Sequence, residues 1–101
     1  MHFRNLSKTD NELVTRIDEV LHYLWDPIGI RDVPAARDEY ESYVGPVFSM
    51  LKAGIAAKEI SEHLRKIRVV DMGMGKREDV GSEDEIAEIL VDWQQTILDR
   101  E

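Results

Sequence analysis

Apolar side chains in this chain recur three or four residues apart, the spacing that places them on one face of an α-helix. Three stretches show the pattern clearly, at Leu13, Val14, Ile17, Val20, Leu21 and Leu24, at Ile60, Leu64 and Ile67, and at Ile86, Ile89, Leu90, Trp93 and Ile97. No segment shows the period-two alternation of a half-buried strand. The sequence therefore predicts an all-α fold, a compact bundle of four main helices.

The first helix is predicted over residues 10–25. Thr9 and Glu12 have the spacing of a capping box, with Thr9 as the N-cap. Pro27 ends the helix, because the residue before a proline avoids helical backbone angles. An irregular Trp/Pro/Gly loop over 26–33 follows, and its apolar side chains are expected to tuck into the core: Ile28, Ile30 and Val33.

Residues 34–53 are predicted to be helical, either as one kinked helix or as two pieces. Pro34 suits the first position of a helix, because that position needs no N–H donor. Gly45-Pro46 interrupts the segment, and Gly54 is a suitable stop. Whether the break produces one element or two is left open by the pattern.

A third helix is predicted over about 57–69, and a fourth begins at a second capping box formed by Ser82 and Glu85. Between them, residues 72–79 hold two glycines and no apolar period, which predicts a mobile linker.

The length of 101 residues suits one domain, 1–101, with residues 1–8 expected as a flexible tail. The chain has no cysteine, which excludes disulfides, thiolate zinc sites and a cysteine nucleophile. No apolar run approaches the length of about 18 residues that a membrane span needs. We expect a soluble, cytoplasmic protein that makes no contact with membranes.

Histidines are the commonest metal ligands, and two of them have an acidic neighbour one helical turn before them, His22 after Asp18 and His63 after Glu59. No His-Glu-x-x-His motif is present, and nothing in the spacing forces the two pairs together. Solvated or locally paired histidines are the favoured interpretation. We predict no metal site, no cofactor and no catalytic residue.

The net charge of −8 is unevenly distributed. Residues 1–51 hold five basic and nine acidic side chains, residues 52–77 hold seven and three, and residues 78–101 hold one and nine. The basic middle could pair with the acidic C-terminal segment inside the fold, or it could face an acidic partner. The acidic total repels phosphate backbones and disfavours binding to nucleic acid.

An acidic, aromatic cluster near the first loop is the candidate binding site, and we expect it to be partly exposed. Its members are Trp25, Asp26, Asp38, Glu39, Tyr40 and Tyr43. Tyrosine and tryptophan combine apolar area with a polar group, a mixture enriched at protein-binding surfaces. Alternatively, the three aromatic rings brace the loop while Asp26 caps a turn. A third possibility is acid–base chemistry by the carboxylates.

Residues 53–64 also suit a helix-turn-helix, in which a second helix follows a glycine-containing turn. This alternative is supported by four positively charged residues in and after the second helix: Lys58, Arg65, Lys66 and Arg68. Against it, Glu59 and Glu62 would face the nucleic acid, and any two packed helices with a short turn give the same pattern.

Four segments occur in a distinctive order: Trp25-Asp26-Pro27-Ile28-Gly29-Ile30, Asp38-Glu39-Tyr40-Glu41-Ser42-Tyr43, Ile60 to Leu64, and Met72-Gly73-Met74. Over about residues 13–97 the chain resembles the DUF1871-like family of small bacterial proteins. The resemblance implies a compact helical fold and a bacterial origin, and it carries over no catalytic residue. Two departures stand out: Glu41 replaces a frequent aspartate, and Ala56 or Ala57 replaces a capping serine or aspartate.

The favoured function is a noncatalytic protein-interaction module that binds another protein or a second copy of itself. An immunity protein that neutralises a toxin is one form of this hypothesis, because small, acidic, cysteine-free helical proteins suit that role. A small enzyme using Asp26, Asp38 or Glu39 is the second hypothesis, and a helix-turn-helix DNA reader is the third.

Overall fold

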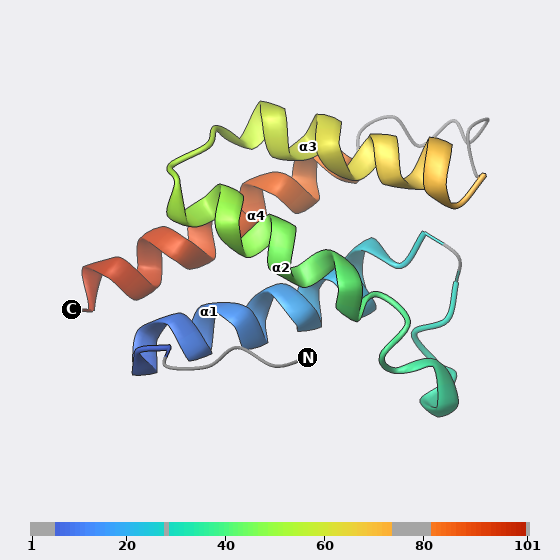
Figure 1. The fold of residues 1–101 in the computed structure, drawn as a ribbon, viewed down its shortest axis with the longest axis horizontal. Helices are drawn as coiled ribbons and strands as arrows, with labels where there is room; N and C mark the ends of the chain where they lie inside the picture. The colour runs from blue at the N-terminus through green and yellow to red at the C-terminus, as the bar shows by residue number, and fades with distance from the viewer. Residues whose placement is uncertain (1–5, 28, 74–81, 101) are drawn as a thin grey trace.

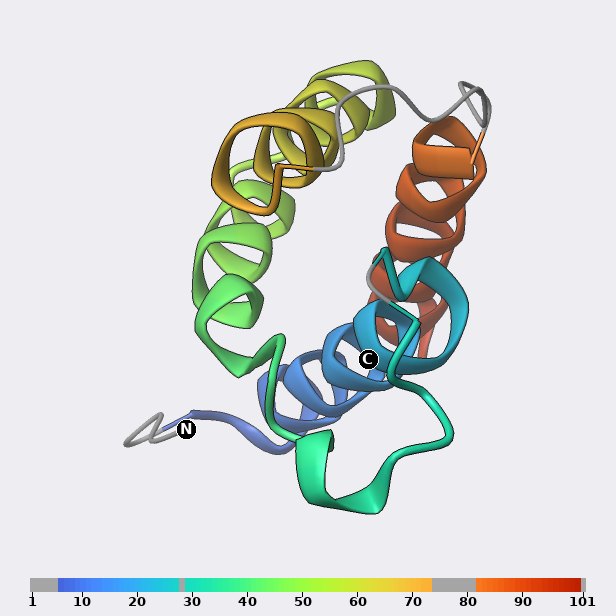
Figure 2. The ribbon, with the colours of Figure 1, turned by 90° about the vertical axis from the view of Figure 1, so that its right-hand side faces the viewer.

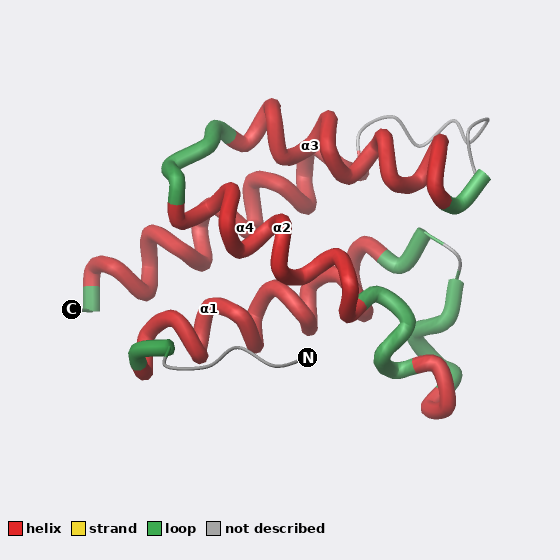
Figure 3. The backbone as a smooth tube through the Cα atoms, viewed as in Figure 1, coloured by secondary structure: helices red, strands yellow, loops and turns green. Residues whose placement is uncertain are grey.

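The computed structural model describes residues 6–27, 29–73 and 82–100, and within these ranges it contains helices and no strand. The four α-helices are α1 (Lys8–Glu19), α2 (Glu41–Lys52), α3 (Ala57–Lys66) and α4 (Ser82–Asp99). The π-helical segments η1 (Val20–Trp25) and η3 (Ile67–Asp71) continue α1 and α3, and a short 3-10 helix, η2 (Pro34–Ala36), lies between η1 and α2 (Figures 1 and 3). The predicted all-α bundle is confirmed.

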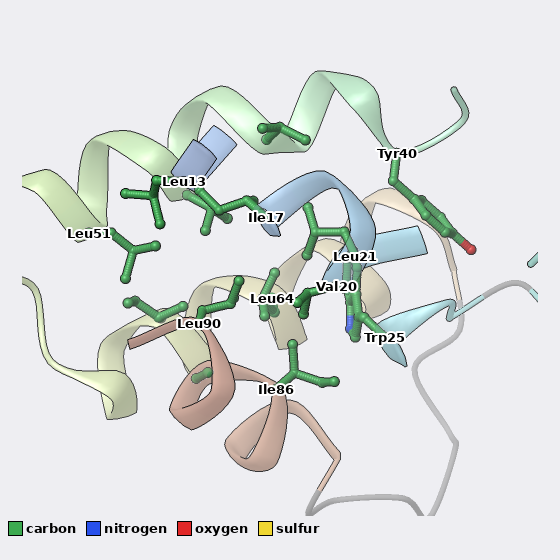
Figure 4. Close-up of a cluster of buried hydrophobic side chains, with 14 of the residues drawn as sticks. Leu13, Ile17, Val20, Leu21, Trp25, Tyr40, Leu51, Leu64, Ile86 and Leu90 are labelled. Atoms are coloured by element: carbon green, nitrogen blue, oxygen red, sulfur yellow. The ribbon is translucent and has the colours of Figure 1, made fainter. Parts of the chain in front are cut away.

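The helices pack around one shared interior, with α4 lying along α3 and α1, and α2 lying on α1. Figure 2 shows the four helices nearly end-on around a common centre. Apolar side chains fill that centre (Figure 4), among them Ile17, Leu21, Val44, Val47, Leu51, Ile60, Leu64, Ile86 and Leu90. The predicted apolar stripes therefore face one another, and their burial is the main force that assembles the helices.

The first helix begins two residues earlier than predicted, at Lys8. Ser7 is the N-cap, and its hydroxyl accepts a hydrogen bond of 3.1 Å from the backbone N–H of Asp10. Thr9 already lies inside α1, so the predicted Thr9–Glu12 capping box is wrong. Leu6 packs against the core and Lys8 is helical, so the predicted flexible tail does not extend to residue 8.

Both π-helical segments end on hydrogen bonds that reach back five residues. The Asp26 N–H donates to the Leu21 carbonyl at 3.0 Å, and the Met72 N–H donates to the Ile67 carbonyl at 3.0 Å. The first helical run therefore extends to Trp25 as predicted, but its last turn is wound more widely than an α-helix. The third run extends to Asp71, two residues beyond the predicted end.

The Gly45-Pro46 dipeptide does not interrupt the second helix. α2 runs continuously from Glu41 to Lys52 with Pro46 inside it, and the segment 37–40 before it forms turns. The helix ends as predicted, because Gly54 adopts φ +74°, a left-handed conformation that costs little without a Cβ. α3 then starts at Ala57 without a side-chain cap, as expected from Ala56.

The first loop buries less apolar surface than predicted. Ile30 packs against the core, but Val33 is exposed, so its predicted burial is wrong. Ile28 lies outside the described residues, as do positions 74–79 of the predicted linker and the side chain of the predicted Ser82 cap.

Within the described ranges, every helix is too short or too polar to cross a lipid bilayer.

Candidate functional site

The carboxylate of Asp26 organises the loop that leaves η1. Asp26 caps η1 in the left-handed region at φ 36°, a conformation that aspartate tolerates better than most residues. Its Oδ1 accepts hydrogen bonds from the Ile30 N–H at 2.7 Å and the Tyr40 hydroxyl at 2.9 Å. Its Oδ2 accepts one from the Arg31 N–H at 3.1 Å. The Asp26 side chain thus connects the end of η1 to the middle of the loop and to Tyr40, which directly precedes α2.

The pKa of Asp26 reflects this arrangement. Burial alone would raise it, because desolvation disfavours the charged form. The hydrogen bonds from Ile30, Tyr40 and Arg31, with the nearby Arg31 guanidinium, outweigh burial and hold the pKa of Asp26 below its ordinary value of 3.8. The group is therefore ionised at neutral pH and has its lone pairs engaged, which suits a structural acceptor rather than a proton donor or acceptor in catalysis.

Three aromatic rings pack behind this loop. Tyr40 is 1% exposed and Trp25 is 6% exposed, and their ring centroids lie 5.7 Å apart (Figure 4). Tyr43, which is half-buried, meets Trp25 edge-on at 6.3 Å. These contacts are the offset and edge-to-face arrangements that aromatic pairs favour. The rings join the end of η1 to the start of α2.

Trp25 also reaches a buried ion pair between distant parts of the chain. The Arg68 Nε and Nη2 atoms lie 3.0 and 3.1 Å from the two carboxylate oxygens of Glu83, which makes the pair bidentate. The Trp25 Nε1–H donates to Glu83 Oε2 at 3.1 Å. Arg68 is 4% exposed and Glu83 is 1% exposed. This Glu83 cluster, defined as Trp25, Arg68 and Glu83, connects η1, η3 and the first turn of α4.

His22 is buried beside the loop. Its Nε2 lies 3.3 Å from the Arg31 carbonyl oxygen, which places the proton on Nε2 as donor. Nδ1 has no hydrogen-bond partner in the described part of the chain. The ring contacts Tyr23 edge-on at 4.5 Å and lies 6.4 Å from Tyr40. Of the two states expected for the histidines, solvated or locally paired, His22 is paired, and its contact with the Arg31 carbonyl anchors the loop.

The structure separates the predicted site residues by exposure. Trp25 and Tyr40 are buried, so the expectation that they are partly exposed is wrong. Asp26 and Tyr43 are half-buried, as expected, although the Asp26 carboxylate faces inward. The contacts of these residues match the alternative interpretation, in which the rings brace the loop and Asp26 caps a turn. Asp38 and Glu39 are exposed as expected.

The carboxylates of the enzyme hypothesis do not converge. A shallow depression of about 360 Å³ is lined by Asp18, Arg37, Asp38 and Glu41, and it takes in neither Asp26 nor Glu39. Arg37 binds Asp18 through both Nη atoms at 3.3 and 2.9 Å, and this carboxylate raises the pKa of Arg37. Within the described ranges, no three His, Asp or Glu side chains gather closely enough to hold a metal ion.

The basic residues of the DNA hypothesis do not form one free surface. Arg68 is buried on Glu83, and Arg65 lies 3.9 Å from Asp84. Lys58 and Lys66 remain exposed. Of the two alternatives for the basic middle of the chain, pairing with the acidic C-terminal segment occurs at these two contacts. Two of the four proposed phosphate ligands are therefore engaged within the protein.

The Glu83 cluster was missed by the sequence analysis, although a signal exists. Arg68 lies four residues after Leu64, and Glu83 lies seven residues before Leu90, so each charge occupies an apolar stripe. Opposite charges on two stripes that face each other favour a buried pair. The Trp25 contact had no such signal, because it joins residues 58 positions apart.

Four large exposed apolar side chains lie on the two helical segments at one end of the molecule. η1 presents Tyr23 and Leu24, and η3 presents Val69 and Val70. Figures 1 and 2 show the ends of η1 and η3 at the same end of the bundle, and the Glu83 cluster joins them. We name these four residues the apolar end. Exposed Val33 lies in the connection that leaves η1.

Comparisons with models of known families, with curated proteins and with solved structures gave no match to this chain.

Proposed function

We propose that this chain is a noncatalytic protein-interaction module and that the apolar end is its contact surface. The observation that carries the proposal is the exposure of Leu24 and Val70, 55% and 66% respectively, on two helical segments fixed to each other. Tyr23 and Leu24 form one exposed apolar pair and Val69 and Val70 another, and exposed apolar surface of this kind typically marks interaction sites.

The contact surface differs from the aromatic cluster expected from the sequence. Trp25 and Tyr40 support it from inside, and the neighbouring Tyr23 and Leu24 face outward. Covering one such side chain by a partner contributes about 1 kcal/mol, part of the 1.5–3 kcal/mol for full burial. The partner is a different protein, because a net charge of −8 opposes self-association.

The finer parts of the proposal rest on the sequence. The ordered motifs around Trp25, Tyr40 and Gly73 support membership of the DUF1871-like family and hence a bacterial origin. The absence of cysteine supports a cytoplasmic location, where thiols stay reduced and disulfides are rare. A toxin-neutralising immunity protein is the specific form of interaction module that we propose, since its acidic surface would complement a basic toxin.

Site-specific cross-linking in the native cell tests the contact surface. A photoreactive amino acid is placed at Leu24, at Val70 or at Leu98, which is also an exposed leucine but lies in the last turn of α4. We expect positions 24 and 70 to capture one and the same protein and position 98 to capture none. Mass spectrometry identifies the captured chain.

Two results would contradict the proposal. Equal capture at all three positions would mean that the apolar end has no special role. Capture of a second copy of this chain from positions 24 and 70 would make the surface a self-association interface. A single captured basic protein would support the immunity form of the proposal.

A further inference from the structure

Within the described part of the chain, the Glu83 carboxylate accepts hydrogen bonds from three side-chain donors on two other segments. Arg68 supplies two donors in the planar fork that fits a carboxylate, and Trp25 supplies the third. None of the three side chains has freedom to move without breaking a contact, because all are buried. The hydrogen bonds of the cluster therefore form only when η1, η3 and the first turn of α4 keep these relative positions.

Stability alone does not explain such a cluster. Removing two charges from water costs about as much as their attraction returns, and replacing a buried pair with apolar side chains is often neutral or stabilising. The attested use of buried polar groups is to select one arrangement among several that apolar packing would allow. Two alternative arrangements of the helices around Arg68 and Glu83 would be compatible with apolar packing.

The first alternative is a slide between helices. The facing stripes of α3 and α4 are aliphatic, with Ile60 and Leu64 on one side and Ile86 and Leu90 on the other. Aliphatic stripes pack with similar energy after a shift of one turn, about 5.4 Å. Such a shift would leave Arg68 and Glu83 buried and apart, which is strongly unfavourable.

The second alternative is a change of winding. η1 and η3 end on hydrogen bonds from residue i to residue i−5, Asp26 to Leu21 and Met72 to Ile67, whereas an α-helix uses i to i−4. An α-wound η1 would turn Trp25 about the helix axis and remove its indole from Glu83. The cluster therefore favours the π-helical form.

We propose that the Glu83 cluster is a register lock, which selects one helix register and one winding at this end of the bundle. Leu24 adjoins Trp25, and Val69 adjoins Arg68, so the lock also sets the spacing of the two halves of the apolar end. That consequence rests on the proposed function, whereas the lock itself does not.

A double substitution tests the lock without any partner. Arg68→Met with Glu83→Leu replaces the ion pair with apolar side chains of similar size. The matched control is Arg100→Met with Glu12→Leu, which removes an exposed pair at 3.0 Å. We expect both variants to unfold cooperatively, the control with a melting temperature within about 5 °C of the parent chain. The Arg68/Glu83 variant should melt about 10 °C lower, because the buried Trp25 indole N–H loses its acceptor.

Amide spectra then distinguish the variants. In the Arg68/Glu83 variant, the resonances of residues 20–26 and 67–72 should split or broaden, while those of α2 stay single. The control should match the parent chain throughout. A single sharp set of resonances in the Arg68/Glu83 variant would overturn the lock. Loss of folding in that variant would also overturn it, by showing that the pair mainly provides stability.

Trp25→Phe provides a milder test, because it removes one donor and keeps an aromatic ring. We expect hydrogen exchange of the Asp26 amide, which closes η1, to become about tenfold faster relative to the amides of α2, the equivalent of one hydrogen bond to a charged group. Unchanged relative exchange would contradict the lock. These readouts do not depend on cross-linking at positions 24 and 70, so the lock and the proposed function can fail separately.

Discussion

At the scale of single residues, Asp26 shows what local sequence can predict. The Asp-Pro dipeptide and Gly29 indicate a turn, and an aspartate that caps a turn was one of the interpretations of the motif. Its third donor, the Tyr40 hydroxyl, comes from 14 residues further on, and no local rule supplies that pairing. The burial of Trp25 was equally unpredictable, because its partner Glu83 is 58 residues away.

Asp26→Asn tests the carboxylate with little change in shape. Asparagine tolerates the left-handed conformation and keeps one acceptor oxygen, but its NH2 group presents donors in place of the other oxygen of a carboxylate that accepts three hydrogen bonds. We expect a loss of about 1.5–3 kcal/mol in the free energy of unfolding at neutral pH, the range for hydrogen bonds to a charged group. Urea unfolding measures this difference.

The difference in stability between the parent chain and the Asp26→Asn variant should depend on pH in a defined direction. The pKa of Asp26 is lower in the folded state than in the unfolded state, so its contribution is complete above the ordinary value of 3.8. The contribution declines as pH falls through that value towards the lower folded pKa. A difference that stays constant from neutral pH to acid would show that the negative charge contributes nothing.

At the scale of elements, the sequence places helices well and their ends less well. The spacing of apolar residues along a helix is a local property of the sequence, so this spacing predicts where the helices lie. The N-cap was misplaced because Ser7 and Thr9 are both good caps, and their hydroxyls lie 3.1 Å apart. The proline in α2 was read as a break, yet burial of Val44, Val47 and Leu51 on one face holds the helix together across it.

Replacing Pro46 with alanine should therefore stabilise the protein. Pro46 is exposed and supplies no N–H to the carbonyl of Ser42, one turn earlier. Proline inside a helix costs about 3 kcal/mol, from which about 1 kcal/mol is subtracted for the greater freedom of the unfolded alanine chain. We expect a gain of about 1–2 kcal/mol in thermal or urea unfolding.

Pro34→Ala is the matched control for that substitution. Pro34 is exposed and opens η2, where no helical N–H is needed, so alanine there should give no gain and a loss of up to about 1 kcal/mol. Equal effects at positions 34 and 46 would mean that the missing hydrogen bond in α2 is not the cause.

At the scale of the whole molecule, fold class follows from the stripes, but the arrangement at the apolar end does not. Four amphipathic helices bury their apolar faces whichever residues flank those faces. Which charges become buried, and which apolar side chains stay outside, depends on how η1, η3 and α4 meet. The apolar stripe of the first helix included Leu24, yet the wider π-helical turn leaves this residue 55% exposed.

Leu64 and Leu24 have different roles: Leu64 packs in the core, and Leu24 belongs to the proposed contact surface. Leu64 is fully buried in the core (Figure 4), and Leu64→Ala should lower the free energy of unfolding by about 2–5 kcal/mol through lost burial and an unfilled cavity. Leu24→Ala should change it by about 0.5 kcal/mol or less, because the side chain already faces water. In the cross-linking assay, Leu24→Ala should nevertheless reduce capture from position 70. A large loss of stability from Leu24→Ala would place that side chain in the core and remove it from the contact surface.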